Sequence, residues 1–474
     1  MGETAESRSA GRWRLSAALW LATAFVSSAM AAAPAPMPGA LAVPGIEEVH
    51  LQAEHWISRL QAPDRVILDR AGIDAQNARM QALDPTLHDL ETLPARLPAA
   101  QVRDAIGKLS APPARTLYDA QGRELTGTQL AAFADNLALD AIPDMRPLEY
   151  GLVTRRADLR AFPTTERVFS SVGDTDIDRF QESALFPGDA VAVMHRSRDG
   201  QWLFVASQRY LAWIEKRFVA VGDAGQVFGY ARRMPYRIVT GATVSTAYTP
   251  EQPQVSRLQL DMGVRVPVLA DWPADTPVNG QHPYTSHVIE LPIRDDDGRL
   301  RLVPALLPRN ADTRADYLPL TARNLLLQSF KFLGERYGWG HAYDARDCSG
   351  FVSEVYRSFG VLLPRNTSAQ AVSPALDRVP LTGTDGERKR RRAIAQLQVG
   401  DLIYIPGHVM MAIGRENGLT YVIHDTAGGS WRDGDGQRVQ ARLNGVAVTP
   451  LEPLLAGDAA SYIDRITSIQ RIRP

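Results

Sequence analysis

Hydrophobic residues follow a helical period early in the chain and a shorter period in its middle. Over residues 46–140 they recur at helical spacing, which predicts a mainly helical N-terminal segment. Over residues 146–221 the period falls towards two, as in Ala190–Met194 and Trp202–Ala206. Short strands separated by turn signals are typical of a small β-barrel. We therefore expect a helical segment followed by a barrel.

A second all-β stretch and a mixed region complete the pattern. Residues 230–310 contain the strand-like runs Val264–Leu269 and Val288–Ile293. The acidic run 295–297 precedes a glycine but lacks the later glutamate of a calcium loop, which favours a solvated hairpin tip. The hydrophobic pattern of residues 319–474 predicts helices, then a loop, then strands. This order is typical of an α+β domain. Two small barrels therefore precede an α+β domain.

The first 31 residues predict a cleaved export signal. Arginines precede an apolar run from Leu15 to Met30, which ends in a small-residue cleavage site at 29–31. This run is shorter than the roughly 20 residues that span a membrane, and no cysteine follows it for lipid attachment. Prolines over 32–45 predict a stiff spacer. We expect a periplasmic or secreted protein, non-lipidated and without a stable membrane anchor after signal cleavage.

Length and charge narrow the class of protein. A chain of 474 residues with 45% apolar and 22% charged positions fits several globular domains. Its 52 basic and 53 acidic residues give a formal net charge of -1, which favours no nucleic-acid partner. The basic run Arg388–Arg392 lacks interleaved aromatic residues and is interpreted as an exposed loop.

The chain contains one cysteine, Cys348, which cannot form an internal disulfide. Such a thiol is either a small buried hydrophobe or a chemically used group. Asp347 is a good N-cap, so Cys348 falls on the first turn of a helix whose apolar stripe stops at Gly360. The positive end of the helix dipole there favours a thiolate over a thiol. The position indicates a nucleophile.

Two histidines accompany this cysteine on predicted strands. If the polar link Gly414–Gly418 closes a symmetric hairpin, His408 and His424 are direct cross-strand neighbours, with Cβ atoms about 5 Å apart. One imidazole, His408, would take the proton of Cys348 while His424 orients it. A chance pair and a zinc site made by the three residues remain alternatives.

Other histidines offer weaker signals. His50, His55 and His88 lack metal-ligand spacing with a cysteine or a carboxylate cluster, so we interpret them as structural or solvated residues. No cofactor and no bound metal are expected.

The ordered motifs of the C-terminal region resemble those of the NlpC-type cysteine peptidases of the bacterial cell wall. They are Tyr337–Gly340, Asp347–Phe351, Leu363–Asn366 with Gln370, Gly400–Leu402 and His408–Val409. The resemblance covers about a third of the chain. It implies a papain-like α+β fold and cleavage of peptidoglycan stem peptides between D-γ-glutamate and a diamino acid. It also implies Cys348 as nucleophile, His408 as base and His424 as the third polar residue.

The upstream chain resembles the multidomain members of the same family. Phe162–Pro163, Asp178–Gln181, Asp199–Gly200, Trp202 and Tyr210–Trp213 look like parts of a bacterial SH3-like barrel. The resemblance implies two such barrels after a helical stabilising segment. Barrels in this position are expected to restrict the cleft and hold the stem peptide.

The resemblance also suggests substrate-binding residues, namely Tyr337, Asp347, Ser349, Asn366 and Thr367. Some members hold the free amine of an L-alanine-terminated peptide with an acid and a serine, where this chain has Asn366 and Thr367. Asparagine supplies no charge to an ammonium group, so the preference for free stem peptides stays open. His341 replaces the usual glycine and is interpreted as a loop residue without a role, with an extra polar group at the rim of the cleft as the alternative.

We therefore expect a secreted cysteine endopeptidase that acts on stem peptides or muropeptides. The backbone N–H of Cys348 and a neighbour such as Tyr337 would stabilise the oxyanion, and His408 would return the proton to the leaving amine. Two alternatives stay open. The chain could be a non-catalytic peptidoglycan-binding protein that uses its barrels, or an acyltransferase with the same three residues.

Overall fold

The computed structural model describes residues 42–458 and 460–473. The predicted signal peptide and most of the proline-rich spacer lie outside these ranges. Within them, no helix has the length and apolar character needed to cross a membrane. The predicted mixed architecture of helices and strands is confirmed.

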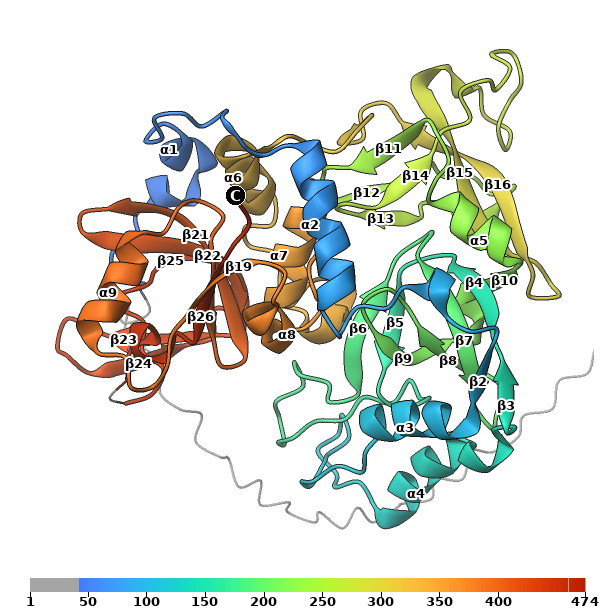
Figure 1. Ribbon diagram of the computed structural model, residues 1–474, viewed down its shortest axis with the longest axis horizontal. Helices are drawn as coiled ribbons and strands as arrows, with labels where there is room; N and C mark the ends of the chain where they lie inside the picture. The colour runs from blue at the N-terminus through green and yellow to red at the C-terminus, as the bar shows by residue number, and fades with distance from the viewer. Residues whose placement is uncertain (1–41, 459, 474) are drawn as a thin grey trace, which may run out of the picture. The chain divides into compact units, whose positions relative to one another are not determined.

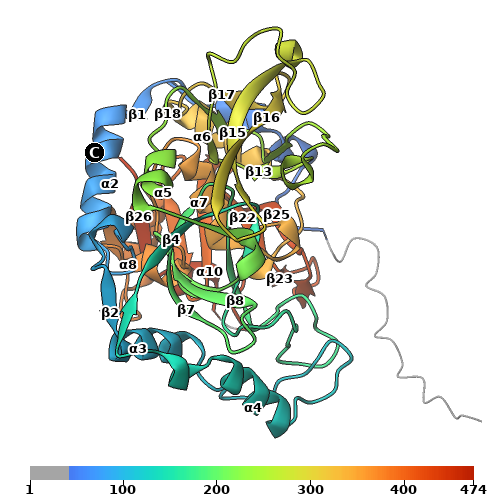
Figure 2. The same cartoon turned by 90° about the vertical axis from the view of Figure 1, so that its right-hand side faces the viewer.

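The N-terminal segment divides between two cores. Its first elements pack on the C-terminal domain, where Trp56 and Met80 share a core with Phe351, and β1 pairs with β18. These elements are η1 (Glu48–Leu51), α1 (Ala53–Ile57), β1 (Val66–Leu68) and α2 (Arg70–Leu83). The later helices cover the first barrel, as Figures 1 and 2 show for α3 and α4. The later elements are η2 (Leu90–Thr92), β2 (Arg96–Pro98), α3 (Ala99–Leu109), α4 (Gly127–Asn136), η3 (Leu139–Ala141) and β3 (Met145–Pro147).

The first barrel is one antiparallel sheet in the order β10-β4-β7-β8-β9-β5-β6. Its strands are β4 (Glu149–Val153), β5 (Ala157–Arg160), β6 (Gln181–Leu185), β7 (Ala190–Arg196), β8 (Trp202–Ala206), β9 (Leu211–Glu215) and, after η4 (Lys216–Phe218), β10 (Val219–Gly222). The predicted strands Ala190–Met194 and Trp202–Ala206 are confirmed as parts of β7 and β8. Phe204 and Trp213 lie fully buried in the core that the sheet shares with α3.

The second all-β region follows α5 (Ala224–Tyr230) and surrounds its own core, which includes Val264 and Ile289. Its elements are β11 (Tyr236–Val239), β12 (Thr243–Ser245), η5 (Pro253–Val255), β13 (Gln259–Asp261), β14 (Arg265–Pro267), η6 (Pro283–Thr285), β15 (Ser286–Arg294), β16 (Leu300–Pro308) and β17 (Thr313–Arg314). The acidic run 295–297 lies in the turn that joins β15 to β16, as predicted.

The C-terminal domain is built on a six-stranded sheet in the order β19-β26-β20-β21-β22-β25. Helix α7 packs against β21 and β22, next to that sheet in Figure 1. The helices are α6 (Ala322–Phe330), η7 (Trp339–Asp344), α7 (Cys348–Arg357), α8 (Thr367–Val372), α9 (Glu387–Ala395) and α10 (Tyr462–Arg465). The strands are β18 (Leu320–Thr321), β19 (Asp377–Pro380), β20 (Leu402–Ile405), β21 (His408–Glu416), β22 (Leu419–Thr426), β23 (Gly429–Arg432), β24 (Arg438–Ala441), β25 (Gly445–Pro450) and β26 (Ser468–Arg471).

The basic run is not the loop that the sequence predicts, although four of its five residues are exposed as expected. Residues 388–392 lie inside α9, and Arg390 is buried. Its guanidinium donates to the backbone carbonyls of Ile463 and Ile466 at 3.0 and 2.8 Å. A guanidinium that satisfies orphan carbonyls in this way has a structural role. Sequence composition could not show it, because the acceptors lie more than 70 residues away.

Candidate active site

The single cysteine opens helix α7, as the sequence predicts. The Asp347 carboxylate caps the helix by accepting a hydrogen bond from the Gly350 N–H at 2.7 Å. The Cys348 side chain is buried, and its sulfur lies 3.5 Å from the Thr367 hydroxyl at the start of α8. The backbone N–H of Val409, the residue after His408, lies beside the sulfur and acts to lower the pKa of the thiol. Three elements of the domain therefore meet at this sulfur.

The two predicted histidines contact each other directly. Nε2 of His408 lies 2.7 Å from Nδ1 of His424, and Nε2 of His424 lies 3.0 Å from the Thr449 hydroxyl on β25. If His408 is to accept a proton at Nδ1, its Nε2 must carry the hydrogen and donate to His424. Nε2 of His424 then carries its own hydrogen and donates to Thr449. Thr449, which the sequence analysis missed, can accept this hydrogen and so accommodates that tautomer.

The strand pairing that brings the histidines together differs from the prediction. Strands β21 and β22 are joined by the two-residue turn Asn417–Gly418, with φ angles of 49° and 81°, and pair Met411 with Ile423. Extended to the start of β21, this register places Thr426 opposite His408. His408 and His424 are therefore diagonal neighbours, and direct pairing is wrong. They still share a face of the sheet, because the displacement is two residues.

The expectation of a resting thiolate is also wrong. Burial, together with the nearby Asp347 carboxylate, raises the pKa of the Cys348 thiol to about 12. Burial lowers the pKa of His408 to about 4 and holds that of His424 well below its usual value. The helix dipole is therefore outweighed by desolvation. Burial thus favours a neutral thiol at Cys348 and neutral imidazoles at His408 and His424.

Two of the suggested substrate-binding residues are occupied by internal contacts. The Arg365 guanidinium donates to both Asp347 oxygens, at 3.1 and 2.8 Å, and to the Ser349 hydroxyl at 3.0 Å. Ser349 in turn donates to Asp347 at 3.0 Å. Both side chains are buried. Their observed contacts hold the first turn of α7 in place.

His341 is not an inert loop residue, as the sequence analysis assumed. It is buried, and its Nδ1 accepts from Arg365 at 2.7 Å. Its Nε2 lies 3.0 Å from a Glu354 oxygen on α7. Burial and the Arg365 charge lower its pKa well below the usual value, so this imidazole is neutral. It connects the loop before Cys348 to the helix that carries the sulfur.

A buried arginine joins the second all-β region to the same helix. Arg346 is fully buried and donates to Asp261 of β13 at 2.7 Å, to Glu354 of α7 at 2.7 Å and to both Glu335 oxygens. Arg156 of the first barrel also pairs with Asp261. Paired buried charges are costly to break one at a time. Both upstream regions are therefore fixed to the back of the nucleophile helix.

The first barrel also reaches the neighbourhood of the sulfur through residues that the sequence analysis did not single out. The Tyr210 hydroxyl donates to a Glu182 oxygen and lies near the side chain of Asn366, which acts to lower the pKa of that hydroxyl. Asn366 adjoins Thr367, whose hydroxyl contacts the Cys348 sulfur. Glu182 and Tyr210 are partly exposed, and burial raises the pKa of Glu182. The motif Asp178–Gln181 ends one residue before this acid, which is the signal that could have found it.

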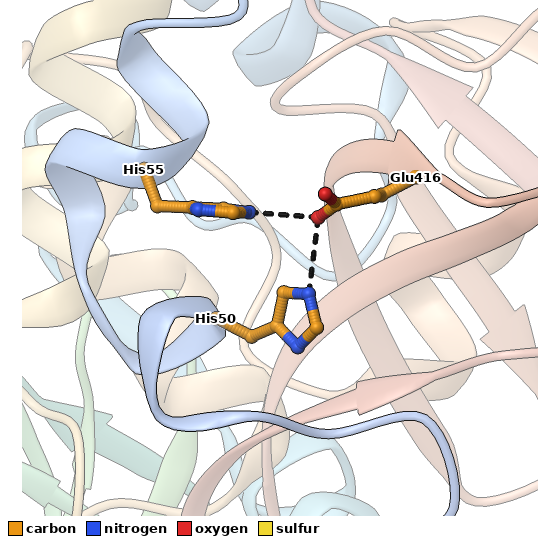
Figure 3. A group of neighbouring side chains, drawn as sticks. All are labelled: His50, His55 and Glu416. Atoms are coloured by element: carbon orange, nitrogen blue, oxygen red, sulfur yellow. Dashed lines mark hydrogen bonds and ion pairs between the residues drawn. The ribbon is translucent and has the colours of Figure 1, made fainter.

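A second histidine pair lies at the N-terminal segment (Figure 3). Nε2 atoms of His50 and His55 lie 3.0 and 2.8 Å from the same oxygen of Glu416, at the end of β21. Their spacing in sequence gave no sign of this carboxylate, which is more than 350 residues away. Three such side chains could in principle hold a metal ion.

The hydrogen bonds of this cluster oppose metal binding. Nδ1 of His50 accepts from the Glu47 backbone N–H at 2.9 Å, and Nδ1 of His55 accepts from Arg59 at 3.1 Å. Each Nε2 therefore carries the hydrogen and donates to Glu416. A metal ion would need those lone pairs, and the Arg59 cation lies 2.8 Å from the other Glu416 oxygen. We interpret the cluster as a clasp between the N-terminal segment and β21.

Comparisons with known proteins agree with this site. Residues 334–451 match the NlpC/P60 family, and residues 167–215 match an SH3 domain of the SH3b1 type. The chain is 24% identical over 295 residues to the gamma-D-glutamyl-L-lysine dipeptidyl-peptidase of Bacillus cereus, covering 58% of this chain and 77% of that protein. It is 29% identical over 127 residues to the probable endopeptidase p60 of Listeria welshimeri, covering 24% of this chain but only 21% of that protein.

The fold of the chain is similar to that of a protein of known structure. An NlpC/P60 endopeptidase from Photobacterium damselae subsp. piscicida superposes with a TM-score of 0.70 at 18% identity, covering 88% of this chain and 95% of that chain. The C-terminal region is thus a papain-like cysteine peptidase domain of the NlpC/P60 family, a family of peptidoglycan hydrolases. The protein is accordingly a hydrolase in which an SH3 domain precedes the peptidase domain.

Proposed function

We propose that this protein is exported and cleaves the bond between D-γ-glutamate and a diamino acid in peptidoglycan stem peptides whose N-terminal amine is free. The observation that carries the proposal is the contact chain from the Cys348 sulfur through Thr367 and Asn366 to Tyr210 and Glu182. The relative from Bacillus cereus, whose name states a dipeptidyl-peptidase activity, supports the bond assigned.

In the proposed reaction, Cys348 attacks the γ-carbonyl carbon of D-glutamate. His408 takes the thiol proton at Nδ1 as the C–S bond forms, because neither group is ionised at rest. The backbone N–H of Cys348 and the Tyr337 hydroxyl stabilise the oxyanion. His408 then gives the proton to the leaving amine, and a water molecule hydrolyses the thioester with His408 as base.

The free amine is assigned to Glu182. An ammonium group needs a negative partner in a partly buried site, and Asn366 cannot supply one. Glu182 lies on the first barrel within the same contact chain, where Tyr210 orients its carboxylate. A peptide with L-alanine and D-glutamate before the scissile bond would then extend from the sulfur towards the barrel. An acylated amine would bring no charge to Glu182 and would leave that carboxylate unpaired.

The test compares L-alanyl-γ-D-glutamyl-L-lysine with the same peptide acetylated at its N-terminus. We expect the wild type to release lysine from the free peptide with a kcat/KM at least a hundredfold higher. The Glu182→Gln variant should lose most of that preference, whereas Glu166→Gln, an exposed acid of the same barrel, should keep it. Equal cleavage of both peptides would contradict the assignment of the amine. No cleavage of either peptide by folded wild type would contradict the function.

Export is tested separately by fractionating cells that express the full chain. We expect the protein in the periplasm or the medium, shortened at its N-terminus by about 31 residues, the length of the predicted signal. Full-length protein retained in the cytoplasm would contradict this part of the proposal.

A further inference from the structure

A cavity of about 660 Å³ lies between α2, the first barrel, α5 and the start of the C-terminal domain. Its size is in the range of small-molecule sites, which run from about 300 to 1,000 Å³. Cys348, His408 and Glu182 are not among the residues that line it. The cavity is therefore separate from the peptidase site and plays no part in the reaction proposed above.

The wall of this cavity carries a cation without a partner. Arg209, in the turn between β8 and β9, lines the cavity. Among residues 42–458 and 460–473, no group forms a hydrogen bond or an ion pair with its guanidinium. Burial, together with the positive charges of Arg357 and Arg365, lowers the pKa of Arg209 to about 10. Five N–H donors thus face a partly buried space without an acceptor.

A second guanidinium supports the same interpretation. Arg265 also lines the cavity, and its Nη1 atom is buried without any hydrogen-bond partner in the described chain. Its Nη2 atom donates to the backbone carbonyl of Arg233 at 2.5 Å. Buried donors are almost always satisfied in native proteins, so the buried Nη1 atom of Arg265, beside the partly exposed Arg209, indicates a missing acceptor.

The acidic residues that line the cavity do not supply this acceptor, because each has other partners. Asp189 pairs with Arg357 at 3.0 Å and accepts from the Phe186 N–H at 2.8 Å. Glu91 pairs with Arg232. Asp89 accepts from the backbone at the start of η2. No carboxylate of the described residues forms an ion pair with Arg209, although the charges of Asp189 and Glu354 act on it at longer range.

We propose that this cavity binds a small molecule that carries an oxyanion, a carboxylate or a phosphate, with Arg209 as its principal partner. The planar fork of arginine matches either anion in a bidentate contact. Phe228 and Tyr317 line the same space and offer apolar surface to the rest of the ligand. Since Arg209 belongs to the first barrel and Arg357 to α7, the ligand would bridge these two parts of the chain.

The experiment follows thermal unfolding and isothermal titration of the full chain with three probes at fixed ionic strength in chloride. These are inorganic phosphate, N-acetylmuramic acid, which carries a carboxylate, and N-acetylglucosamine, its uncharged counterpart. We expect saturable binding and a rise in Tm with phosphate or N-acetylmuramic acid and none with N-acetylglucosamine, because a ligand that binds only the folded state stabilises it. Which anion binds identifies the source of the oxyanion.

Variants separate this site from general charge effects. Arg209→Gln should weaken anion binding at least tenfold, and without anion its Tm should equal or exceed that of the wild type, because an unpaired cation is removed. Arg217→Gln, an exposed arginine of the same barrel, should bind as the wild type does. Arg209→Lys, which keeps the charge but not the fork, should bind with intermediate affinity and serves if the glutamine variant does not fold. The proposal is overturned if neither anion binds saturably or if Arg209→Gln binds both as the wild type does.

Discussion

Two histidine pairs lie at β21: His50 and His55, which contact its last residue, and His408 with His424, of which His408 is its first residue. They differ in how many of their ring nitrogens have hydrogen-bond partners. In the clasp, all four ring nitrogens of His50 and His55 have partners, and two of them donate to Glu416. In the active site, His424 is fully engaged, but Nδ1 of His408 has no hydrogen-bond partner within the described chain. Only the pair with a free ring nitrogen can therefore take part in proton transfer. A saturated pair can only hold structure, whereas an unsaturated one can accept a proton.

The largest effect is expected when the free nitrogen is removed. His408→Gln keeps a polar side chain but no basic site, so the neutral thiol has no acceptor for its proton. We predict a fall in kcat/KM of about 10⁴-fold on the free tripeptide. His88→Gln, a histidine outside both pairs, should be unchanged and controls for histidine loss in general. Activity within tenfold of wild type for His408→Gln would mean that another base serves Cys348.

A smaller effect is expected from the residues that orient His408. His424→Ala should lower kcat by about a hundredfold, and Thr449→Val by about three- to tenfold, because only the tautomer and the ring orientation are weakened. For Thr449→Val the loss should fall on kcat and leave KM unchanged, whereas a general structural defect would change both and lower Tm. In the double variant, the loss of transition-state free energy should be smaller than the sum of the two separate losses. If the losses were additive, His424 and Thr449 would act independently, and the proposed hydrogen-bond chain from His408 through His424 to Thr449 would be wrong.

The pH dependence of kcat/KM distinguishes a buried base from an exposed one. Because burial lowers the pKa of His408 to about 4, the imidazole stays neutral, and able to accept a proton, at every pH above that value. Activity should therefore fall only as the pH drops through about 4, not through the usual histidine value near 6.5. An acidic limb centred near 6.5 in a pH–rate profile would show that His408 is solvated in the working enzyme.

The smallest effect on activity is expected at the clasp. Glu416→Gln should leave kcat/KM within twofold of wild type but lower Tm, since the glutamine cannot pair with Arg59 or accept as strongly from the histidines. The hydrogen bond from His55 and the other contacts lower the pKa of Glu416 from 4.5 to about 2. Its stabilising contribution is therefore complete above about 4.5 and is lost as the pH falls towards 2. A Tm of the variant equal to that of the wild type at pH 7 would show that the clasp adds nothing to stability.

Local signals in the sequence predicted the parts of this site that depend on local physics. The N-cap Asp347 and the helical stripe after Cys348 sufficed to predict the helix that begins at the cysteine, and the alternation of two strands sufficed to predict that both histidines share a sheet face. The pairing register escaped prediction because a two-residue turn and a bulge, rather than a symmetric loop, set it. Because the observed register differs from the predicted one by two residues, His408 and His424 still lie on the same face of the sheet.

Residues that act across long separations in sequence could not be predicted. Thr449, Glu182 and Glu416 reach their histidine and tyrosine partners only through the tertiary fold, and no spacing rule connects them. The burial that raises the pKa of Cys348 is likewise a property of the packed domain, whereas the helix dipole is a property of the local sequence. The sequence therefore indicated a nucleophile but gave the wrong resting protonation state.

The account rests on Cys348 as the atom that attacks the substrate. The most direct measurement is the release of lysine from L-alanyl-γ-D-glutamyl-L-lysine by the Cys348→Ala variant, with its fold checked by circular dichroism and Tm. We predict a folded protein with no release above the uncatalysed background. Release by this variant at a rate within a hundredfold of the wild type would contradict the account.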